Sequence, residues 1–147
     1  MQISPARLHF ILLLAALALI LPSTVLGQRF LLREIVVIPV YPIDANTFEV
    51  IENDGAGGTQ LWCAAGKFTR GYLHQRGGDL TVLTPRAASA TFPGRKSVVF
   101  TTRPTSNAFR SASQGVRQAG QTFSMAHAYT LCKSRYDLYI KLRVVRP

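Results

Sequence analysis

The stretch TQLWCAAGKFTRGYL, residues 59–73, limits the fold most strongly because it joins a helical pattern to one of only two cysteines. At 100° per residue its apolar side chains fall on one side of a helix, and Cys63 falls on the opposite side with Lys67. We therefore predict an amphipathic helix that begins with Thr59 as its N-cap. Gly66 weakens such a helix by about 1 kcal/mol relative to alanine, so tertiary packing has to hold it. The apolar side consists of Leu61, Ala64, Ala65, Phe68 and Tyr72.

The first 27 residues are typical of a secretory signal peptide. They carry Arg7, no acidic residue, and an uninterrupted apolar run of twelve residues at positions 10–21. We expect cleavage after Gly27, which leaves residues 28–147 as a single domain in the periplasm or outside the cell. The alternative is an uncleaved membrane anchor, although a membrane-spanning helix needs about 20 apolar residues.

The two cysteines, Cys63 and Cys132, are expected to form one disulfide in an exported chain. Such a bond closes a loop of about 70 residues and stabilises the fold by about 4 kcal/mol on chain-entropy grounds. Because Cys63 lies opposite the apolar side of its helix, a second helix must approach from the side or back. The first helix would then lie between that helix and a sheet.

The rest of the chain reads as α+β, with a mostly antiparallel sheet of four to six short strands and two helices. Residues 30–43 hold Pro39 and Pro42, which favours an edge strand or an extended arm. Residues 115–132 fit either a strand or a helix; we expect a short strand near Val116 and a helix over 124–132 capped by Ser124. The remaining expected strands are residues 47–52, 80–84, 97–102 and 137–145.

Charge is distributed unevenly along the chain. Without the first 27 residues it has sixteen lysines and arginines against seven acids, and five of those acids lie before residue 55. The basic remainder favours anionic partners such as anionic lipid, acidic polysaccharide or an envelope protein; specific nucleic-acid binding is not expected. Aromatic and basic residues interleave at three places, as binding of a polyanion requires, although a solvated basic surface explains the same pattern. The candidate anion-binding residues are Arg95, Lys96, Arg110, Lys141 and Arg143.

Other chemistries have weaker sequence support. Glycines at 55, 57 and 58 precede the helix as in a phosphate cradle, but no Lys-Ser/Thr pair follows and Glu52 and Asp54 would repel phosphate. Cys63 near Lys67 could be a reactive thiol with a histidine as base, but a disulfide removes that thiol. No histidine or cysteine has the spacing of metal ligands, and we expect neither metal nor cofactor.

The LWCAAGKF stretch at residues 61–68 and the FSMAHAYTLC stretch at residues 123–132, behind a signal peptide, resemble small exported proteins of alphaproteobacteria. The resemblance covers under a fifth of residues 28–147 and implies a periplasmic location and a disulfide, but no activity. We therefore expect a non-enzymatic binding or envelope-associated domain. The alternatives are an enzyme that uses Cys63 or a carboxylate site, and a protein inhibitor or a subunit of an envelope complex.

Overall fold

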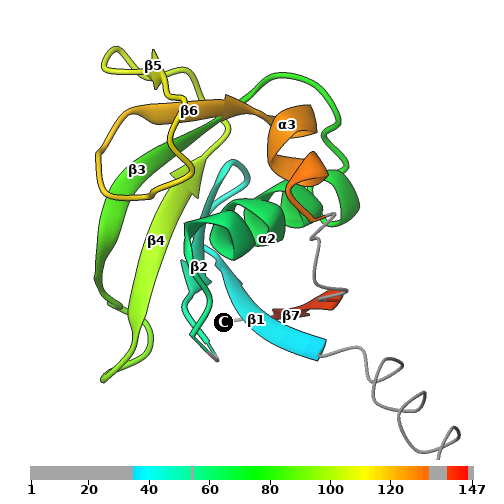
Figure 1. The fold of residues 1–147 in the computed structure, drawn as a ribbon, viewed down its shortest axis with the longest axis vertical. Coiled ribbons are helices and arrows are strands. Elements are labelled where there is room, and N and C mark those ends of the chain that lie inside the picture. The colour runs from blue at the N-terminus through cyan, green and yellow to red at the C-terminus, as the bar shows by residue number, and fades with distance from the viewer. Residues whose placement is uncertain (1–34, 54, 133–138, 146–147) are drawn as a thin grey trace, which may run out of the picture. The chain divides into compact units, whose positions relative to one another are not determined.

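The computed structural model of the protein describes residues 35–53, 55–132 and 139–145. The signal peptide predicted at residues 1–27 lies outside this range. Seven strands of the described residues form one sheet in the order β5-β6-β3-β4-β2-β1-β7, and helix α2 lies within its curve with α3 close by (Figure 1). The elements are β1 Ile35–Pro42, β2 Thr47–Ile51, α2 Gly58–Gly71, β3 Asp79–Ala88, β4 Lys96–Thr101, β5 Phe109–Arg110, β6 Gln121–Ser124, α3 Met125–Thr130 and β7 Tyr139–Val144.

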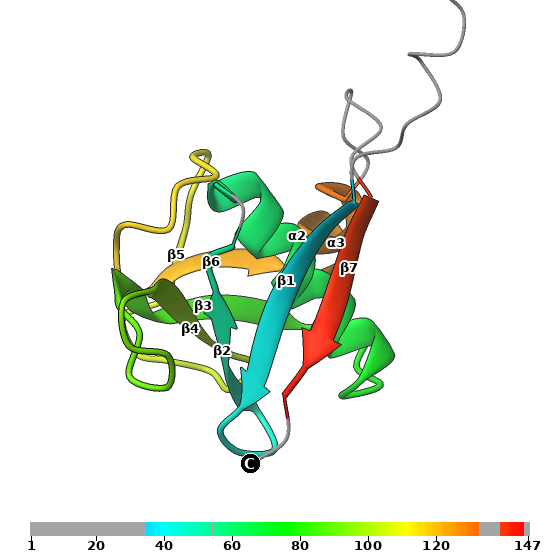
Figure 2. The same cartoon turned by 90° about the horizontal axis from the view of Figure 1, so that it is seen from below.

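The sheet confirms the α+β class but has more strands than expected and is mixed. β7 runs parallel to β1 and β5 runs parallel to β6, while the other neighbours are antiparallel. β7, the last strand of the chain, lies beside β1, the first, and both run in the same direction (Figure 2). Local alternation in β7 could not reveal which strand it would join.

The expectation of an edge strand or arm at residues 30–43 is wrong, because β1 lies between β2 and β7. The antiparallel pairing with β2 covers only Val40 to Pro42 of β1. Pro39 therefore lies just beyond that ladder, where its missing N–H breaks no recorded pair with β2. Pro42 is paired with Phe48 inside the β1–β2 ladder and Pro39 with Arg143 inside the β1–β7 ladder, so this inner strand accommodates both prolines.

β3 also extends further than the predicted 80–84 segment. Pro85 was expected to end it, but the strand continues to Ala88 with register shifts against β4 on both sides of Thr84. These irregularities allow the proline to sit inside the strand without disrupting a regular ladder.

The core fills the space between α2 and one face of the sheet. Phe48 and Val50 of β2 lie opposite Phe100 and Val98 of β4, and all four are fully buried. The ring of Trp62 contacts Phe100 at a centroid distance of 4.9 Å and Phe123 at 4.5 Å. The only tryptophan in the sequence thus joins α2 to strands on both sides of β3.

The ends of α2 differ from the prediction. Its N-cap is Gly57 rather than Thr59, and the side chain of Gln60 accepts a hydrogen bond of 3.0 Å from the Gly57 N–H. The Thr59 hydroxyl instead donates to the Gln114 side-chain oxygen at 2.6 Å. Tyr72, predicted to face the core, is 40 % exposed and stacks on Phe68.

The segment 115–132 is partly as predicted. Ser124 caps a helix, its hydroxyl oxygen accepting from the His127 N–H at 3.1 Å, but the helix ends at Thr130. The strand before it is β6, not a strand at Val116. Val116 is buried without being in a strand, and its carbonyl oxygen accepts a hydrogen bond from the Arg86 N–H at 2.9 Å.

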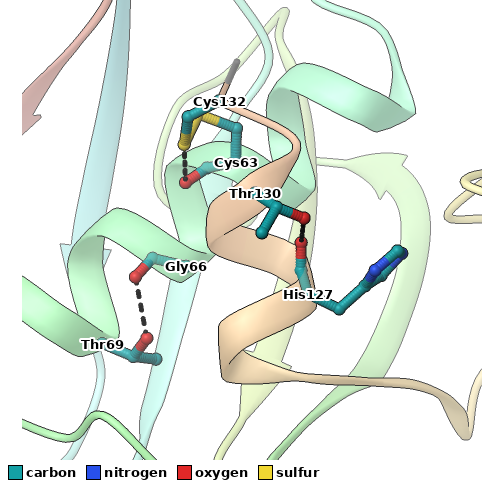
Figure 3. The surroundings of a disulfide bond; sticks show 6 residues. All are labelled: Cys63, Gly66, Thr69, His127, Thr130 and Cys132. Carbon is teal, nitrogen blue, oxygen red and sulfur yellow. Dashed lines mark hydrogen bonds between the residues drawn. A yellow bond between two sulfur atoms is a disulfide. The ribbon is translucent and has the colours of Figure 1, made fainter.

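The predicted disulfide between Cys63 and Cys132 is present, with 4.8 Å between the two Cα atoms (Figure 3). It fixes the end of α3 to the middle of α2, so α2 is covered both by the sheet and by α3, as its sequence pattern required. Neither helix in the described part of the chain is long and apolar enough to cross a membrane.

Gly66 allows the two helices to approach closely. A Cβ atom added there would lie 2.6 Å from the Tyr129 backbone nitrogen, whereas a Cβ at Gly71 of the same helix would meet nothing within 4 Å.

We predict that Gly66→Ala lowers the free energy of unfolding by about 1–3 kcal/mol, because the crowding outweighs the gain in helix propensity. The matched Gly71→Ala should leave it unchanged or raise it by up to about 1 kcal/mol. Urea denaturation measures both, and equal stability of the two variants would contradict the close helix contact.

Candidate anion-binding pocket

A pocket of about 450 Å³ lies on the face of the sheet that is turned away from α2. Val36, Ile38 and Val40 of β1 belong to the core, so the alternating residues between them point to the opposite face. β1, β2 and β7 supply its floor, and the loop between β3 and β4 supplies one side. The lining residues are Val37, Pro39, Ile51, Asn53, Phe92, Arg95, Arg143 and Val145.

Two of the five candidate anion-binding residues, Arg95 and Arg143, meet at this pocket. Arg143 lies opposite Pro39 in the β1–β7 pair, and Arg95 comes from the loop before β4. The guanidinium of Arg95 donates to the side-chain oxygen of Asn53, whose amide donates to the Val37 carbonyl oxygen at 2.9 Å. The side-chain position of Arg95 is therefore tied to the backbone of β1.

The structure separates the other three candidates from the pocket lining. Lys96 lines a neighbouring hollow that shares Asn53 and Arg95 with the pocket. Lys141 is exposed on β7, two residues before Arg143, and does not line the pocket. Arg110 is on β5, at the other edge of the strand order, where it pairs with an aspartate. The predicted basic residues therefore do not form one continuous stripe.

Within the described residues, no acidic side chain is paired with either pocket arginine, although Glu52 lines the neighbouring hollow that shares Arg95. The ion pairs among the described residues belong to other arginines, while Arg95 and Arg143 take part in none. Two guanidinium groups at one concave site produce a local positive potential that favours an anion. The recorded pairs are Arg86–Glu52, Arg103–Asp44 at 3.5 Å and Arg110–Asp79 at 2.7 Å.

The loop that carries Arg95 is anchored by a buried carboxylate. Glu49 of β2 is only 2 % exposed. It accepts hydrogen bonds from the hydroxyls of Ser97 and Thr91, and from the Ser89 hydroxyl at 2.8 Å. The Ser89 hydroxyl oxygen in turn accepts from the Phe92 N–H at 2.9 Å. One carboxylate thus fixes the conformation of a loop that supplies two of the lining residues.

Burial and hydrogen bonding have opposite effects on this carboxyl. Burial alone raises the pKa of Glu49, but the hydrogen bonds from Ser97, Thr91, Ser89 and the backbone of Ala90 outweigh it and hold the pKa below its ordinary value. The fold therefore stabilises the ionised form of Glu49. Glu49 takes part in none of the ion pairs between described residues.

The alternative chemistries find little support in the geometry. Cys63 is fully buried and disulfide-bonded, so it is not a reactive thiol. A side chain at Gly58 would collide with the Gln114 carbonyl oxygen, so that glycine makes room for a loop rather than for a phosphate. Of the acids that the structure describes, Glu49 is buried among hydroxyls and the other three are in ion pairs. The described part of the chain contains no cluster of three metal-ligating side chains.

Comparison with known proteins gives no further guidance. No family model matches the chain, and neither the curated proteins nor the solved structures contain a match.

Apart from Phe92, the residues that surround the two arginines carry no functional signal in the sequence. Asn53 precedes the glycines before the helix, and Val37 and Ile51 are ordinary apolar strand residues. Their role depends on β7 joining β1 and on the β3–β4 loop folding over the same face. The pairing of Phe92 with Arg95 was the one local signal, because an aromatic residue and a cation occur together in a loop.

We predict that Glu49→Gln lowers the free energy of unfolding by about 1.5–3 kcal/mol at pH 7, because hydrogen bonds to a buried charge are lost. The folded-state pKa is depressed, so this stabilisation is present above the unfolded-state pKa and disappears as pH falls through the folded-state value. The difference between wild type and variant should therefore shrink at acid pH.

Urea denaturation of both proteins at pH 7 and at pH values stepped downward from 4 measures this difference. Glu52→Gln is the matched control, since Glu52 is more exposed than Glu49 and is satisfied by a bidentate ion pair with Arg86 instead of buried hydroxyls. An equal destabilisation by Glu49→Gln at all pH values would contradict the assigned role of the ionised carboxylate.

Proposed function

We propose that this chain is an exported, non-enzymatic binding domain that holds an anionic partner at the pocket lined by Arg95 and Arg143. The observation that carries the proposal is that these two arginines, 48 positions apart in the sequence, line one concave site, and that neither is in an ion pair with a described acidic residue. Arginine is well suited to this task because its planar donors contact carboxylate, sulfate or phosphate in a bidentate manner.

Export to the periplasm or the cell exterior is part of the proposal. It is supported by the apolar N-terminal segment of the sequence and by the disulfide, a bond that persists in oxidising compartments. The resemblance to small exported proteins of alphaproteobacteria favours the same location.

A binding role fits the described residues better than catalysis. The buried thiol is oxidised, and the described carboxylates serve structural contacts. The pocket offers positive charge and apolar surface, which suit recognition, and the described side chains that line it include no nucleophile, carboxylate or histidine. A protein inhibitor or complex subunit remains the second candidate, and a single defined protein partner in a pull-down from an envelope extract would favour it.

The test compares two double variants that remove the same charge. We expect Arg95→Gln/Arg143→Gln to elute from heparin at lower salt than Arg103→Gln/Arg110→Gln, because the control arginines are already paired with Asp44 and Asp79. Retention is measured across a salt gradient, with wild type as reference and circular dichroism as the check on folding. Equal elution of the two double variants would overturn the assignment of anion binding to this pocket.

A further inference from the structure

The walls of the pocket carry information about its ligand that the arginines alone do not. More than half of the accessible lining is hydrocarbon, contributed by Val37 and Pro39 of β1, Phe92 of the β3–β4 loop and Val145 after β7, while Ile51 of β2 is fully buried. Apolar surface contributes nothing to holding a fully hydrated sulfate or phosphate group. It stabilises a ligand that brings its own apolar part out of water.

The geometry points to a small amphiphilic anion as the ligand class of this pocket: one anionic headgroup at Arg95 and Arg143, with a short aliphatic or aromatic body against Val37, Pro39 and Phe92. This inference rests on the proposed anion-binding function and adds the chemistry of the rest of the ligand. The pocket volume of about 450 Å³ is within the usual range for small-molecule sites, but two other hollows are about as large, so the lining and not the size carries the inference.

An extended polyanion fits the same residues less well. A polysaccharide or nucleic acid is held by a row of cations along its length. Here Arg110 lies on β5 at the opposite edge of the strand order and is paired with Asp79, and Lys141 is outside the lining. Arg95 and Arg143 line one hollow and Lys96 lines the next, so these cations form a short cluster that suits a headgroup better than a long chain of charges.

The two parts of the site are held in place together. Glu49 fixes Ser89 and Thr91, and through Ser89 the backbone of Phe92, so the apolar wall and Arg95 belong to one anchored loop. Asn53 connects Arg95 to the β1 backbone at Val37, whose side chain is part of the floor of the pocket. Because these groups are positioned before binding, little ordering cost accompanies the ligand.

The experiment titrates the purified, disulfide-bonded protein with acetate, butanoate, hexanoate and octanoate at constant ionic strength. Backbone amide shifts in two-dimensional NMR report both the affinity and the location. We expect affinity to rise by up to about fourfold for each added methylene, the ratio that corresponds to full burial of one CH₂ group. The shifts should centre on the residues lining the pocket.

Three variants separate the headgroup from the body of the ligand. Arg95→Gln/Arg143→Gln should weaken every member of the series by about tenfold or more, since charge-assisted hydrogen bonds are lost. Phe92→Ala should weaken octanoate by about fivefold or more and leave acetate nearly unchanged, because only the longer chain reaches the wall. Arg103→Gln/Arg110→Gln is the charge-matched control and should bind as wild type does.

The outcomes distinguish this inference from the proposed function. If all chain lengths bind equally and binding is lost in Arg95→Gln/Arg143→Gln, the anion site stands and the amphiphilic ligand is overturned. If affinity rises with chain length but is unchanged in that variant, both proposals are overturned. If no carboxylate binds while the protein sediments with phosphatidylglycerol vesicles, the ligand class is overturned in favour of a membrane surface.

Discussion

The fold depends on the contact between α2 and α3, where the chain closes its core. Gly66 presents no side chain, so the backbone of α3 at Ala128 and Tyr129 approaches α2 directly. The Cys63–Cys132 disulfide holds the same contact one turn away, and it closes a loop of about 70 residues. With α2 fixed from that side, its apolar side chains are held against the sheet, and Leu61, Trp62 and Phe68 are fully buried there. A glycine that weakens an isolated helix is thus the residue that allows this helix to be covered on both sides.

The helices cover one face of the sheet, and the pocket lies on the other face. β1 and β2 show this plainly, since alternate residues enter the core while Val37, Pro39 and Ile51 form the floor of the pocket. A strand with a purely polar outer face would give no apolar floor. The apolar residues on both faces of β1 are consistent with its inner position, and they link the sheet's order to the composition of the pocket.

Much of the local structure could be predicted from the sequence, and the errors have physical reasons. The pattern of residues 59–73, the strands β2 and β4 and the disulfide followed from periodicity and from cysteine usage. The edge position of β1, the end of β3 at Pro85 and the strand at Val116 were wrong, because pairing partners and bulges far along the chain decide them. The same limit applies to the site. Arg95 and Arg143 were identified as basic residues beside aromatic ones, but only the parallel pairing of β7 with β1 brings them to one pocket.

The hydrogen bonds and ion pairs of the described acidic residues explain why Arg95 and Arg143 are not used in ion pairs with them. A buried carboxylate is often satisfied by an arginine, which would then be neutralised. Here Glu49 is satisfied by three hydroxyls and a backbone amide, so its ionised form needs no cation. The ion pairs between described residues involve Arg86, Arg103 and Arg110, and none of these arginines lines the pocket. The positive charge of Arg95 and Arg143 therefore has no acidic partner among the described residues, and the hydroxyl-bound Glu49 anchors the loop that carries Arg95.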